Sequence, residues 1–422
     1  MALVPKPFYL YSPRSLTHFR MIRTIAFLAL VVVFSCNNTS DNQHQASHLH
    51  HTLVDCVSDK SLSPEKLAEV KKRIKADEKA ARLDSLFQRK FKLERFNGNV
   101  LIAQQGVVLY RNSNGYAQVE KKDTLRPDSK FQLASLSKTF TAVAILKLYE
   151  AGKLSLEDSV KKFIPQFPYS GIQVKSLLSH RSGLPNYAYV LTDSVRKRNP
   201  YPTNDDIVRW YCAVKPRPYN TPNTYFSYSN TNYALLATIV ERVSGKTFEA
   251  FLQDSIFKPL GMKNTWLITT QNDSLNQLRT AGYQHNRRLP KDNFDDVVGD
   301  KGVYSTMDDI FRWYAGLSGG CVLRPETLKE AFTPRSFEKR GIRNYGYGFR
   351  MHVDEATKQA KYVYHTGWWK GYNTLMWFSP KDKFVIILLS NRYNRSIYQI
   401  KPILQILEGK GEVDAEIEEG MF

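Results

Sequence analysis

A serine and a lysine three residues apart open a strongly apolar stretch of the chain. Ser135 and Lys138 begin the segment SLSKTFTAVAILKLYE, which is apolar around most of its circumference and precedes Gly152. On a helix, residues three apart lie on the same side. A lysine among apolar neighbours releases its proton more readily, so it can accept the proton of a serine hydroxyl. The pattern indicates a serine nucleophile activated by Lys138, with a helix N-cap as the alternative role of Ser135.

The Ser-x-x-Lys spacing alone is a weak signal, because it recurs elsewhere in the chain. Only Ser135 stands at the mouth of an apolar helix, where the helix dipole favours negative charge on the serine oxygen. The context of the pair, and not its spacing, therefore singles it out. The same spacing is found at Ser63 and Lys66, Ser159 and Lys162, Ser194 and Lys197, and Ser336 and Lys339.

Two further short motifs follow in order along the chain. Residues 228–230 read Tyr-Ser-Asn, and residues 365–367 read His-Thr-Gly within an expected strand. This order resembles the serine β-lactamase and penicillin-binding protein superfamily, in its class C β-lactamase and DD-peptidase branch. Three flanking stretches also resemble that family. They are residues 177–185 (LLSHRSGLP), 259–262 (PLGM) and 302–306 (GVYST).

The resemblance implies roles for the reacting residues. Ser135 would be the nucleophile that forms an acyl-enzyme, and Lys138 would activate it. Tyr228 would share the proton transfer through its phenolic oxygen. Whether Lys138 or Tyr228 is the working base stays open.

The resemblance also implies a set of substrate-binding residues. Asn230 would bond the amide on the acyl side of the substrate and help hold Lys138. The backbone N–H groups of Ser135 and Trp368 would form the oxyanion hole. His365, Thr366 and Gly367 would line the strand beside the leaving group.

Two departures from the family pattern bear on the substrate. At its ordinary pKa of about 6.5, His365 is largely neutral at pH 7, so it attracts a substrate carboxylate less than a lysine would. Trp368 and Trp369 favour a bulky or apolar group. We therefore expect cleavage of a D-amino peptide, ester or related amide. A β-lactamase and a catalytically inactive envelope-binding relative are the alternatives. His180, within residues 177–185, is expected to shape a loop.

The N-terminus resembles an export signal. Residues 25–34 form an apolar run preceded by Arg20 and Arg23, and ten residues are too few to span a bilayer. Residues 33–36 (VFSC) resemble a bacterial lipobox with Cys36 as the lipidated residue. We therefore expect a lipoprotein of the bacterial cell envelope, facing the periplasm or the cell surface and held by its lipid anchor. An uncleaved apolar anchor is the alternative.

Length and charge limit the remaining possibilities. The chain has 422 residues, enough for two or three domains or one large α/β enzyme, and a formal net charge of +20. No nucleic-acid-binding motif accompanies the charge, so we expect no nucleic-acid partner. The expected partners are a small-molecule or peptide substrate, such as one derived from the cell wall, and the membrane. A basic surface-adhesion protein is a further alternative. The chemistry needs no cofactor, and no metal site is assignable.

The expected fold class is α/β (α+β), with an antiparallel sheet flanked by helices and an inserted all-α subdomain. Strands are expected as a hairpin over 99–117 and in the runs 363–378 and 384–389, and a helix over 397–408. A Cys212–Cys321 disulfide is compatible with export, and the oligomeric state stays open. The expected segments are a signal peptide (1–36), a polar tether (37–62), a charged helical segment (63–98), a hydrolase domain (99–410) with its helical subdomain at about 155–290, and an acidic, disordered tail (411–422).

The polar tether contains a cluster of histidines. Four of them could bind a metal ion, but no fixed scaffold or carboxylate partner accompanies them. A flexible connection between lipid anchor and domain is therefore the preferred interpretation. The histidines are His44, His48, His50 and His51.

Overall fold

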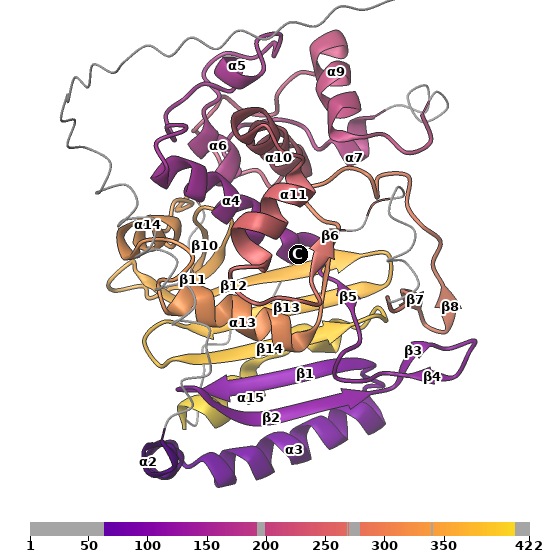
Figure 1. The fold of residues 1–422 in the computed structure, drawn as a ribbon, viewed down its shortest axis with the longest axis vertical. Coiled ribbons are helices and arrows are strands. Elements are labelled where there is room, and N and C mark those ends of the chain that lie inside the picture. Colours follow the sequence, from indigo (N-terminus) through magenta and orange to yellow (C-terminus); the bar gives the residue numbers. More distant parts are fainter. Residues whose placement is uncertain (1–62, 192–198, 268, 270–278, 339–340, 410–422) are drawn as a thin grey trace, which may run out of the picture. The chain divides into compact units, whose positions relative to one another are not determined.

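The computed structural model describes residues 63–191, 199–267, 269, 279–338 and 341–409. A seven-stranded antiparallel sheet lies at the centre of this part of the chain (Figure 1). Its order, β10-β11-β12-β13-β14-β1-β2, places the first hairpin beside the last strand, so distant parts of the sequence pair directly. The strands are β1 Gly98–Gln104, β2 Val107–Asn114, β10 Arg343–Tyr345, β11 Arg350–Val353, β12 Ala360–Trp369, β13 Tyr372–Ser379 and β14 Phe384–Ser390. The expected antiparallel sheet is confirmed.

Both faces of the sheet are covered by helices. The sequence of β14, apolar at alternate positions on both sides, fits this burial. Successive side chains of a strand point to opposite faces, so a strand buried on both sides is apolar throughout. Val385, Ile387 and Leu389 join the core under α4 (Lys138–Glu150) and α13 (Met307–Ser318). On the other face lie α3 (Ala76–Leu93) and α15 (Lys401–Glu408), which pack on Phe384, Ile386 and Leu388.

The charged segment before the sheet forms two helices. Ser63 caps α2 (Pro64–Ile74) by accepting a hydrogen bond from the backbone N–H of Lys66. Lys75 has a φ of 54°, a left-handed conformation that ends α2 and turns the chain into α3. The helical stretch expected from the sequence is therefore interrupted once.

A helical region lies on one end of the molecule, at the top of Figure 1. The described part of the stretch between 155 and 290 also holds three short strands. One of them, β6 (Trp266–Leu267), pairs with β9 (Val303–Ser305), which also pairs with β5 (Phe131–Gln132). The other two form a small hairpin, β7 (Tyr283–Gln284) and β8 (Arg287–Arg288). The helices are α5 Val160–Phe163, α6 Val174–Leu178, α7 Tyr187–Val190, α9 Asn204–Val214, α10 Asn230–Ser244 and α11 Phe248–Leu252, followed by a π turn at Gln253–Phe257.

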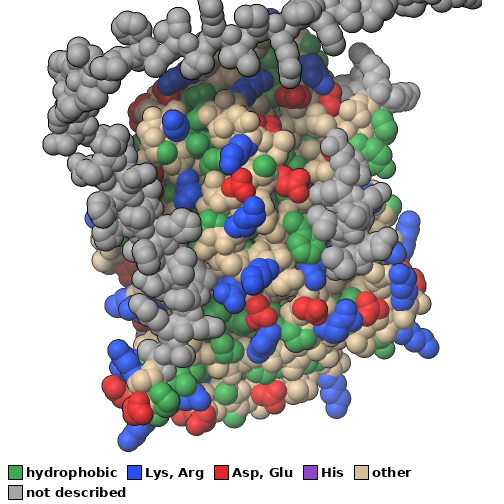
Figure 2. Space-filling model, viewed as in Figure 1, with side chains coloured by type: hydrophobic (Ala, Val, Ile, Leu, Met, Phe, Trp, Pro, Cys, Tyr) green, Lys and Arg blue, Asp and Glu red, His purple; other side chains and the backbone are tan. Residues whose placement is uncertain are grey.

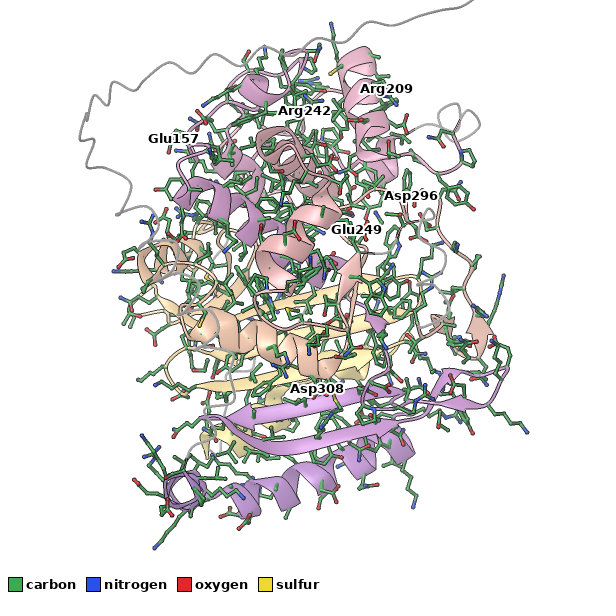
Figure 3. All side chains as sticks on the ribbon, in the orientation of Figure 1. Glu157, Arg209, Arg242, Glu249, Asp296 and Asp308 are labelled. Carbon is green, nitrogen blue, oxygen red and sulfur yellow. The ribbon has the colours of Figure 1, made fainter. Side chains whose placement is uncertain are left out.

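The remaining elements connect these layers. Arg111 of β2 and Asp308 of α13 form an ion pair at 2.5 Å; Figure 3 labels Asp308. Basic side chains are spread over the face shown in Figure 2, with acidic ones between them. Further elements are β3 Tyr116–Gln118, β4 Asp123–Thr124, α14 Pro325–Ala331 and the 3₁₀ turn η3 Arg395–Tyr398.

The structure tests the expected disulfide but not the expectations for the two ends of the chain. Cys212 is a free thiol on α9, packed against the core, so the Cys212–Cys321 disulfide is not formed. The signal peptide, Cys36, the tether and the acidic tail lie outside the described residues. Within the described ranges, no helix combines the length and apolar character that a bilayer crossing requires.

Candidate active site

Ser135 lies in a tight turn and not in the first turn of a regular helix. The 3₁₀ turn η1 (Ala134–Ser137) leads directly into α4. Ala134 is fully buried with a φ of 50°, a left-handed conformation that is unfavourable for alanine. Such a conformation persists where the surroundings impose it, and it often accompanies functional sites. Here it orients the residue that immediately follows, Ser135.

The structure brings Ser135 and Lys138 together. Nζ of Lys138 lies 3.0 Å from Oγ of Ser135 and 2.8 Å from the backbone oxygen of Asp300, and the lysine is fully buried. The N-cap of α4 is Ser137, which makes no capping bond through its side chain. Ser135 therefore does not act as a helix cap here, and its hydroxyl is available to the lysine.

A buried network holds the carbonyl group that Lys138 contacts. Lys301 donates to the hydroxyl of Tyr187 at 2.7 Å and to the Asp300 carboxylate at 3.3 Å, and Tyr187 donates to the same carboxylate at 3.0 Å. All three side chains are almost completely buried. A buried charge pair with hydrogen bonds to both partners tolerates burial far better than an isolated charge. This network fixes the position of the backbone at Asp300.

Tyr228 lies against the lysine. Its ring centroid is 5.1 Å from Nζ of Lys138 and 4.2 Å from the ring of His180. Its hydroxyl is buried and has no hydrogen-bond partner among the described residues. Leaving such a group unpaired costs about 1–3 kcal/mol, so the oxygen is well placed to bond a reacting group.

Asn230, the last residue of the Tyr-Ser-Asn motif, begins α10. Its side-chain oxygen is buried and, like the Tyr228 hydroxyl, unpartnered in the described part of the chain. Nζ of Lys138 bonds Asp300 and Ser135, and no hydrogen bond joins it to the Asn230 oxygen in the described part of the chain. The expected part of Asn230 in holding Lys138 therefore stays a prediction, and its buried oxygen has room in its hydrogen bonding for a substrate amide.

His365 lies on β12 and is fully enclosed. Its Nδ1 is 2.7 Å from the backbone oxygen of Thr366, and its Nε2 is 3.2 Å from the hydroxyl of Tyr345. Burial, reinforced by the positive charges of Arg350 and Lys138, holds the pKa of His365 well below its usual value. The ring is neutral at pH 7, so it supplies no positive charge to the site.

Gly367 lets β12 approach the turn that carries Ser135. A Cβ atom at this position would lie 2.1 Å from the backbone oxygen of Leu133 and 3.1 Å from Cβ of Ala134. Any larger residue would force the strand away. The close contact places the backbone of Trp368, the next residue, beside the η1 turn.

The two tryptophans after Gly367 differ in their surroundings. Trp368 is 52% exposed, and its ring stacks on Tyr393 at 5.1 Å and 13°. Trp369 is half-buried, donates to Asp295 at 3.1 Å and faces the Lys301 ammonium at 5.1 Å. Of the two indoles, Trp368 presents the more open aromatic surface, and the preference of the pair for a bulky or apolar group stays a prediction.

Arg350 is a residue that the motifs do not identify. It lies on β11, opposite Tyr364 of β12, and its guanidinium carbon is 5.0 Å from the ring centroid of Tyr228. Its Nε has no hydrogen-bond partner among the residues that the structure describes. Arg350 thus supplies a permanent positive charge beside the site where His365 supplies none.

His180 organises the loop before Tyr228. It has a φ of 55° and accepts a hydrogen bond from the backbone N–H of Ser229 at 3.2 Å. Burial first, then the charge of Lys138, holds its pKa well below the usual value. The rings of Tyr228, Tyr233 and Tyr345 surround it, which agrees with a loop-shaping part.

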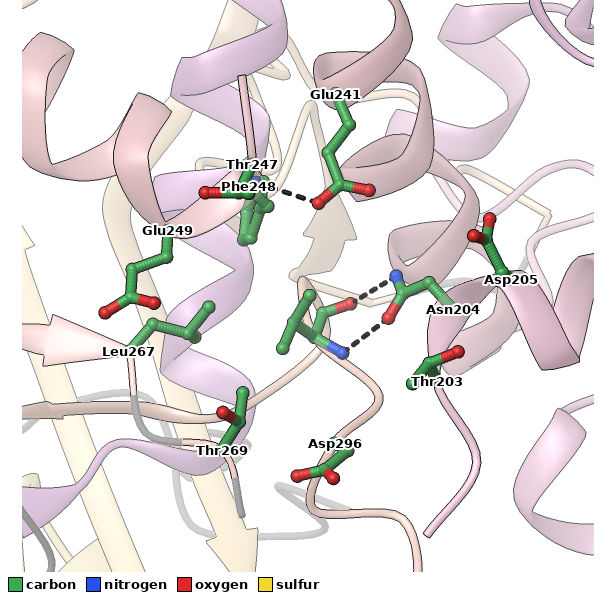
Figure 4. Close-up of a pocket in the computed structure, with 11 residues that line it drawn as sticks. Thr203, Asn204, Asp205, Glu241, Thr247, Phe248, Glu249, Leu267, Thr269 and Asp296 are labelled. Carbon is green, nitrogen blue, oxygen red and sulfur yellow. Dashed lines mark hydrogen bonds between the residues drawn. The ribbon is translucent and has the colours of Figure 1, made fainter. Parts of the chain in front are cut away.

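A separate cavity of about 300 Å³ lies in the helical region (Figure 4). Asn204 spans it by bonding both the N–H and the carbonyl oxygen of Val298, at 2.8 and 3.0 Å. Glu249 and Asp296, labelled in Figure 3, line it together with other carboxylates. None of the residues expected to react lines this cavity.

Comparison with known proteins agrees with this geometry. The family model described as Beta-lactamase matches residues 83–407. The chain belongs to the β-lactamase family. It is a penicillin-binding-protein-like member of this family of serine hydrolases, with Ser135, Lys138, Tyr228 and the His-Thr-Gly strand in one place.

Two relatives and two solved structures illustrate the likeness. Penicillin-binding protein 4* of Bacillus subtilis (strain 168) is 33% identical over 341 residues, 76% of this chain and 74% of that protein. The putative penicillin-binding protein PbpX of the same strain is 27% identical over 322 residues, 72% of this chain and 75% of that protein. A penicillin binding protein from Bacillus halodurans shares the fold with a TM-score of 0.66 at 22% identity, covering 76% of this chain and 98% of that one. The octameric penicillin-binding protein homologue from Pyrococcus abyssi gives 0.68 at 26% identity, covering 78% and 77%.

Proposed function

We propose that the protein is an exported, lipid-anchored serine hydrolase that acts through an acyl-enzyme on a D-amino peptide, an ester or a related amide. One observation carries this proposal. The fully buried Nζ of Lys138 lies 3.0 Å from Oγ of Ser135, within hydrogen-bonding reach of the proton that it would accept. A nucleophile and a base in direct contact, with the base held by a third group, is the arrangement that nucleophilic catalysis requires.

The reaction follows from the positions of these groups. Oγ of Ser135 bonds to the substrate carbonyl carbon while its proton passes to Lys138 or to the Tyr228 oxygen. The backbone N–H groups of Ser135 and Trp368 would stabilise the resulting oxyanion. The bond to the leaving group then breaks, and the leaving amine or alcohol takes up the proton. Water adds to the acyl-enzyme and releases the acid product and free Ser135.

The surroundings of the serine support a substrate with an apolar group on the leaving side. Trp368 offers an exposed aromatic surface beside the expected oxyanion hole, and His365 carries no charge at neutral pH. The names of the Bacillus relatives support a cell-wall-derived peptide. β-Lactam hydrolysis is a second candidate, favoured by Arg350, whose permanent charge beside Tyr228 can attract a carboxylate.

Penicillin labelling of the full chain tests the proposal. Intact-protein mass spectrometry should show a lasting adduct that is absent in Ser135→Ala, while Ser159→Ala, the matched control with the same local sequence spacing, labels normally. Rapid opening of penicillin without a standing adduct would instead establish a β-lactamase. If a folded protein also fails to react with an activated ester such as p-nitrophenyl acetate, it is an inactive relative.

Export and lipid anchoring have a separate test. The apolar run at 25–34 and the lipobox-like Val-Phe-Ser-Cys segment support them. Metabolic labelling with a palmitate analogue in a bacterial host should modify the chain and place it in the membrane fraction. Cys36→Ala should lose the label. Retention of the label in that variant would contradict lipidation at Cys36.

A further inference from the structure

Two separate segments of the chain supply the two halves of the proposed reaction site. The loop 291–301 provides the backbone oxygen of Asp300, which lies 2.8 Å from Nζ of Lys138. The end of the β12–β13 hairpin carries the backbone N–H of Trp368, the expected oxyanion donor. Base and oxyanion donor act on the same substrate group, so the rate depends on their relative position. The contact between this loop and this hairpin therefore bears directly on the reaction.

The hairpin ends in a tight turn that directs its two tryptophans apart. Trp369 pairs with Tyr372, and Lys370 and Gly371 between them have φ values of 41° and 92°. Two left-handed residues in succession form the turn whose twist matches an antiparallel pair. Consecutive side chains of a strand point to opposite faces. Trp368 is therefore exposed, while Trp369 is directed toward the loop.

Trp369 makes two contacts with the loop 291–301. Its Nε1 donates to the Asp295 carboxylate at 3.1 Å, and its ring centroid lies 5.1 Å from Nζ of Lys301. The indole N–H can only donate, which suits a carboxylate acceptor. The face of the ring attracts the ammonium group. Trp369 thus binds an acidic residue through its edge and a basic residue through its face.

Lys301 extends this contact to the base. Its ammonium group is almost completely buried and lies 3.3 Å from the Asp300 carboxylate. The backbone oxygen of the same Asp300 accepts the hydrogen bond from Lys138. A continuous series of contacts therefore joins Trp369 to the ammonium group beside Ser135.

The second link between loop and hairpin is more exposed. Lys370 of the turn pairs with Asp292 of the loop at 2.9 Å, and the lysine side chain is 36% exposed. Ion pairs that water reaches contribute little to holding two segments together. Burial raises the pKa of Asp295, and the hydrogen bonds from the N–H of Asp292 and from Trp369 oppose this rise. Removing the Trp369 donor leaves a poorly hydrated carboxylate without a partner, so this contact matters more than the ion pair.

We propose that Trp369 is a positioning residue, which through Asp295 and Lys301 holds the oxyanion donor of the hairpin in a fixed place relative to Lys138. This inference rests on the proposed serine hydrolase function. The indole of Trp369 then supports the site from behind and does not contact the substrate. Because the geometry that it holds is used only as the transition state forms, its loss should slow acylation and leave substrate binding unchanged.

Stopped-flow acylation of the full chain with a fluorescent penicillin tests the proposal, because it separates binding from acylation. Trp369→Phe keeps a ring near Lys301 and removes the donor to Asp295. The acylation rate constant should fall about tenfold, while the dissociation constant of the unreacted complex changes less than about twofold. Trp266→Phe is the matched control and should alter neither value. Trp266 is also half-buried beside a lysine, Lys130 at 5.6 Å, but its Nε1 bonds no residue in the described ranges.

Variants of the acceptor show whether the hydrogen bond itself is responsible. Asp295→Asn keeps an oxygen that can accept from the indole, so it should acylate at nearly the original rate. Asp295→Leu should slow acylation as Trp369→Phe does. The double variant should be no slower than either single variant, because both changes remove one bond. Losses that multiply in the double variant would overturn the proposal, since the two residues would then act independently.

Other outcomes of the same measurement also contradict the proposal. Acylation of Trp369→Phe at the original rate overturns it, and so does a loss of binding alone, which would make the indole a substrate contact. A smaller labelled fraction with an unchanged rate constant overturns it as well, because Trp369 would then serve only folding. If the unaltered chain reacts with neither penicillin nor p-nitrophenyl acetate, the proposed hydrolase function itself is wrong.

Discussion

Two Ser-x-x-Lys segments with the same spacing are built differently. At Ser159, the hydroxyl caps α5 by accepting a hydrogen bond from the backbone N–H of Lys161 at 3.3 Å. Its lysine, Lys162, is exposed and pairs with Asp158 at 2.8 Å. At Ser135, the hydroxyl caps nothing and meets the side chain of its own lysine, which is fully buried. The same two residue types serve local structure in one place and form a buried side-chain contact in the other.

The backbone conformation at and just before each serine explains the difference. A capping serine has an extended conformation, as Ser159 does with a φ of −65° and a ψ of 142°, and this turns its hydroxyl onto the next N–H groups. Ser135 instead follows Ala134 in a left-handed conformation and enters a 3₁₀ turn. Position in a strained turn beside a buried lysine therefore distinguishes the proposed nucleophile from a capping serine, which spacing alone does not.

Replacing each lysine by methionine should give the largest difference between the two segments. Lys138→Met removes the proton acceptor at 3.0 Å from Ser135, so the rate of acylation should fall by about 10²–10⁴-fold. Lys162→Met, an exposed change of the same size, should leave the rate unaltered. Stopped-flow acylation with a fluorescent penicillin measures both. If Lys138→Met acylates at the original rate, Tyr228 is the base. The two segments would then not differ in the role of their lysines.

Much of the site was accessible from the sequence because its motifs are short and ordered. Ser135 and Lys138 lie in one turn, and Tyr228, Asn230 and His365 stand in motifs of three residues. Arg350 could not be found in this way. Arg350 of β11 lies against Tyr228, which comes more than one hundred residues earlier in the chain, and no short motif records that contact.

Other features were missed for the same physical reason. Ala134 has a left-handed φ where its turn lies against Gly367, more than two hundred residues away, and the alanine residue type does not indicate such a conformation. Lys138 is held by a backbone oxygen, that of Asp300, which has no signature in the sequence. The fold was more predictable, since strands such as β14 are apolar on both faces and their short connections force antiparallel pairing.

Burial changes the chemistry of a histidine as it does that of a lysine. A buried histidine with a lowered pKa makes the free energy of unfolding depend on pH. His352 of β11 lies among the rings of Tyr362, Tyr364 and Trp377, and burial lowers its pKa to about 3. The unfolded chain binds a proton at this residue below about pH 6.5 and the folded chain does not. The contribution of His352 to the free energy of unfolding is therefore fully present above pH 6.5. It is lost as the pH drops toward 3, by up to about 1.4 kcal/mol per pH unit.

His352→Leu should remove that part of the pH dependence. Neither ring nitrogen of His352 has a partner in the described part of the chain, so leucine sacrifices no hydrogen bond. Urea midpoints at pH 7.5 and pH 5 should lie closer together in the variant than in the unaltered protein, while acylation at pH 7.5 stays the same. An unchanged difference between the two midpoints would mean that His352 is protonated in the folded state.

The smallest expected effect returns to the serines themselves. Ser159→Ala removes the cap of α5 and should lower the free energy of unfolding by about 1 kcal/mol, because a backbone N–H loses its acceptor. Ser135→Ala removes no cap, so its unfolding free energy should change less even though acylation is lost. Denaturant titration of both variants measures the two values. If Ser135→Ala lowered the free energy of unfolding more than Ser159→Ala does, the Ser135 hydroxyl would serve the fold. The proposed difference between a nucleophilic serine and a capping serine would then be wrong.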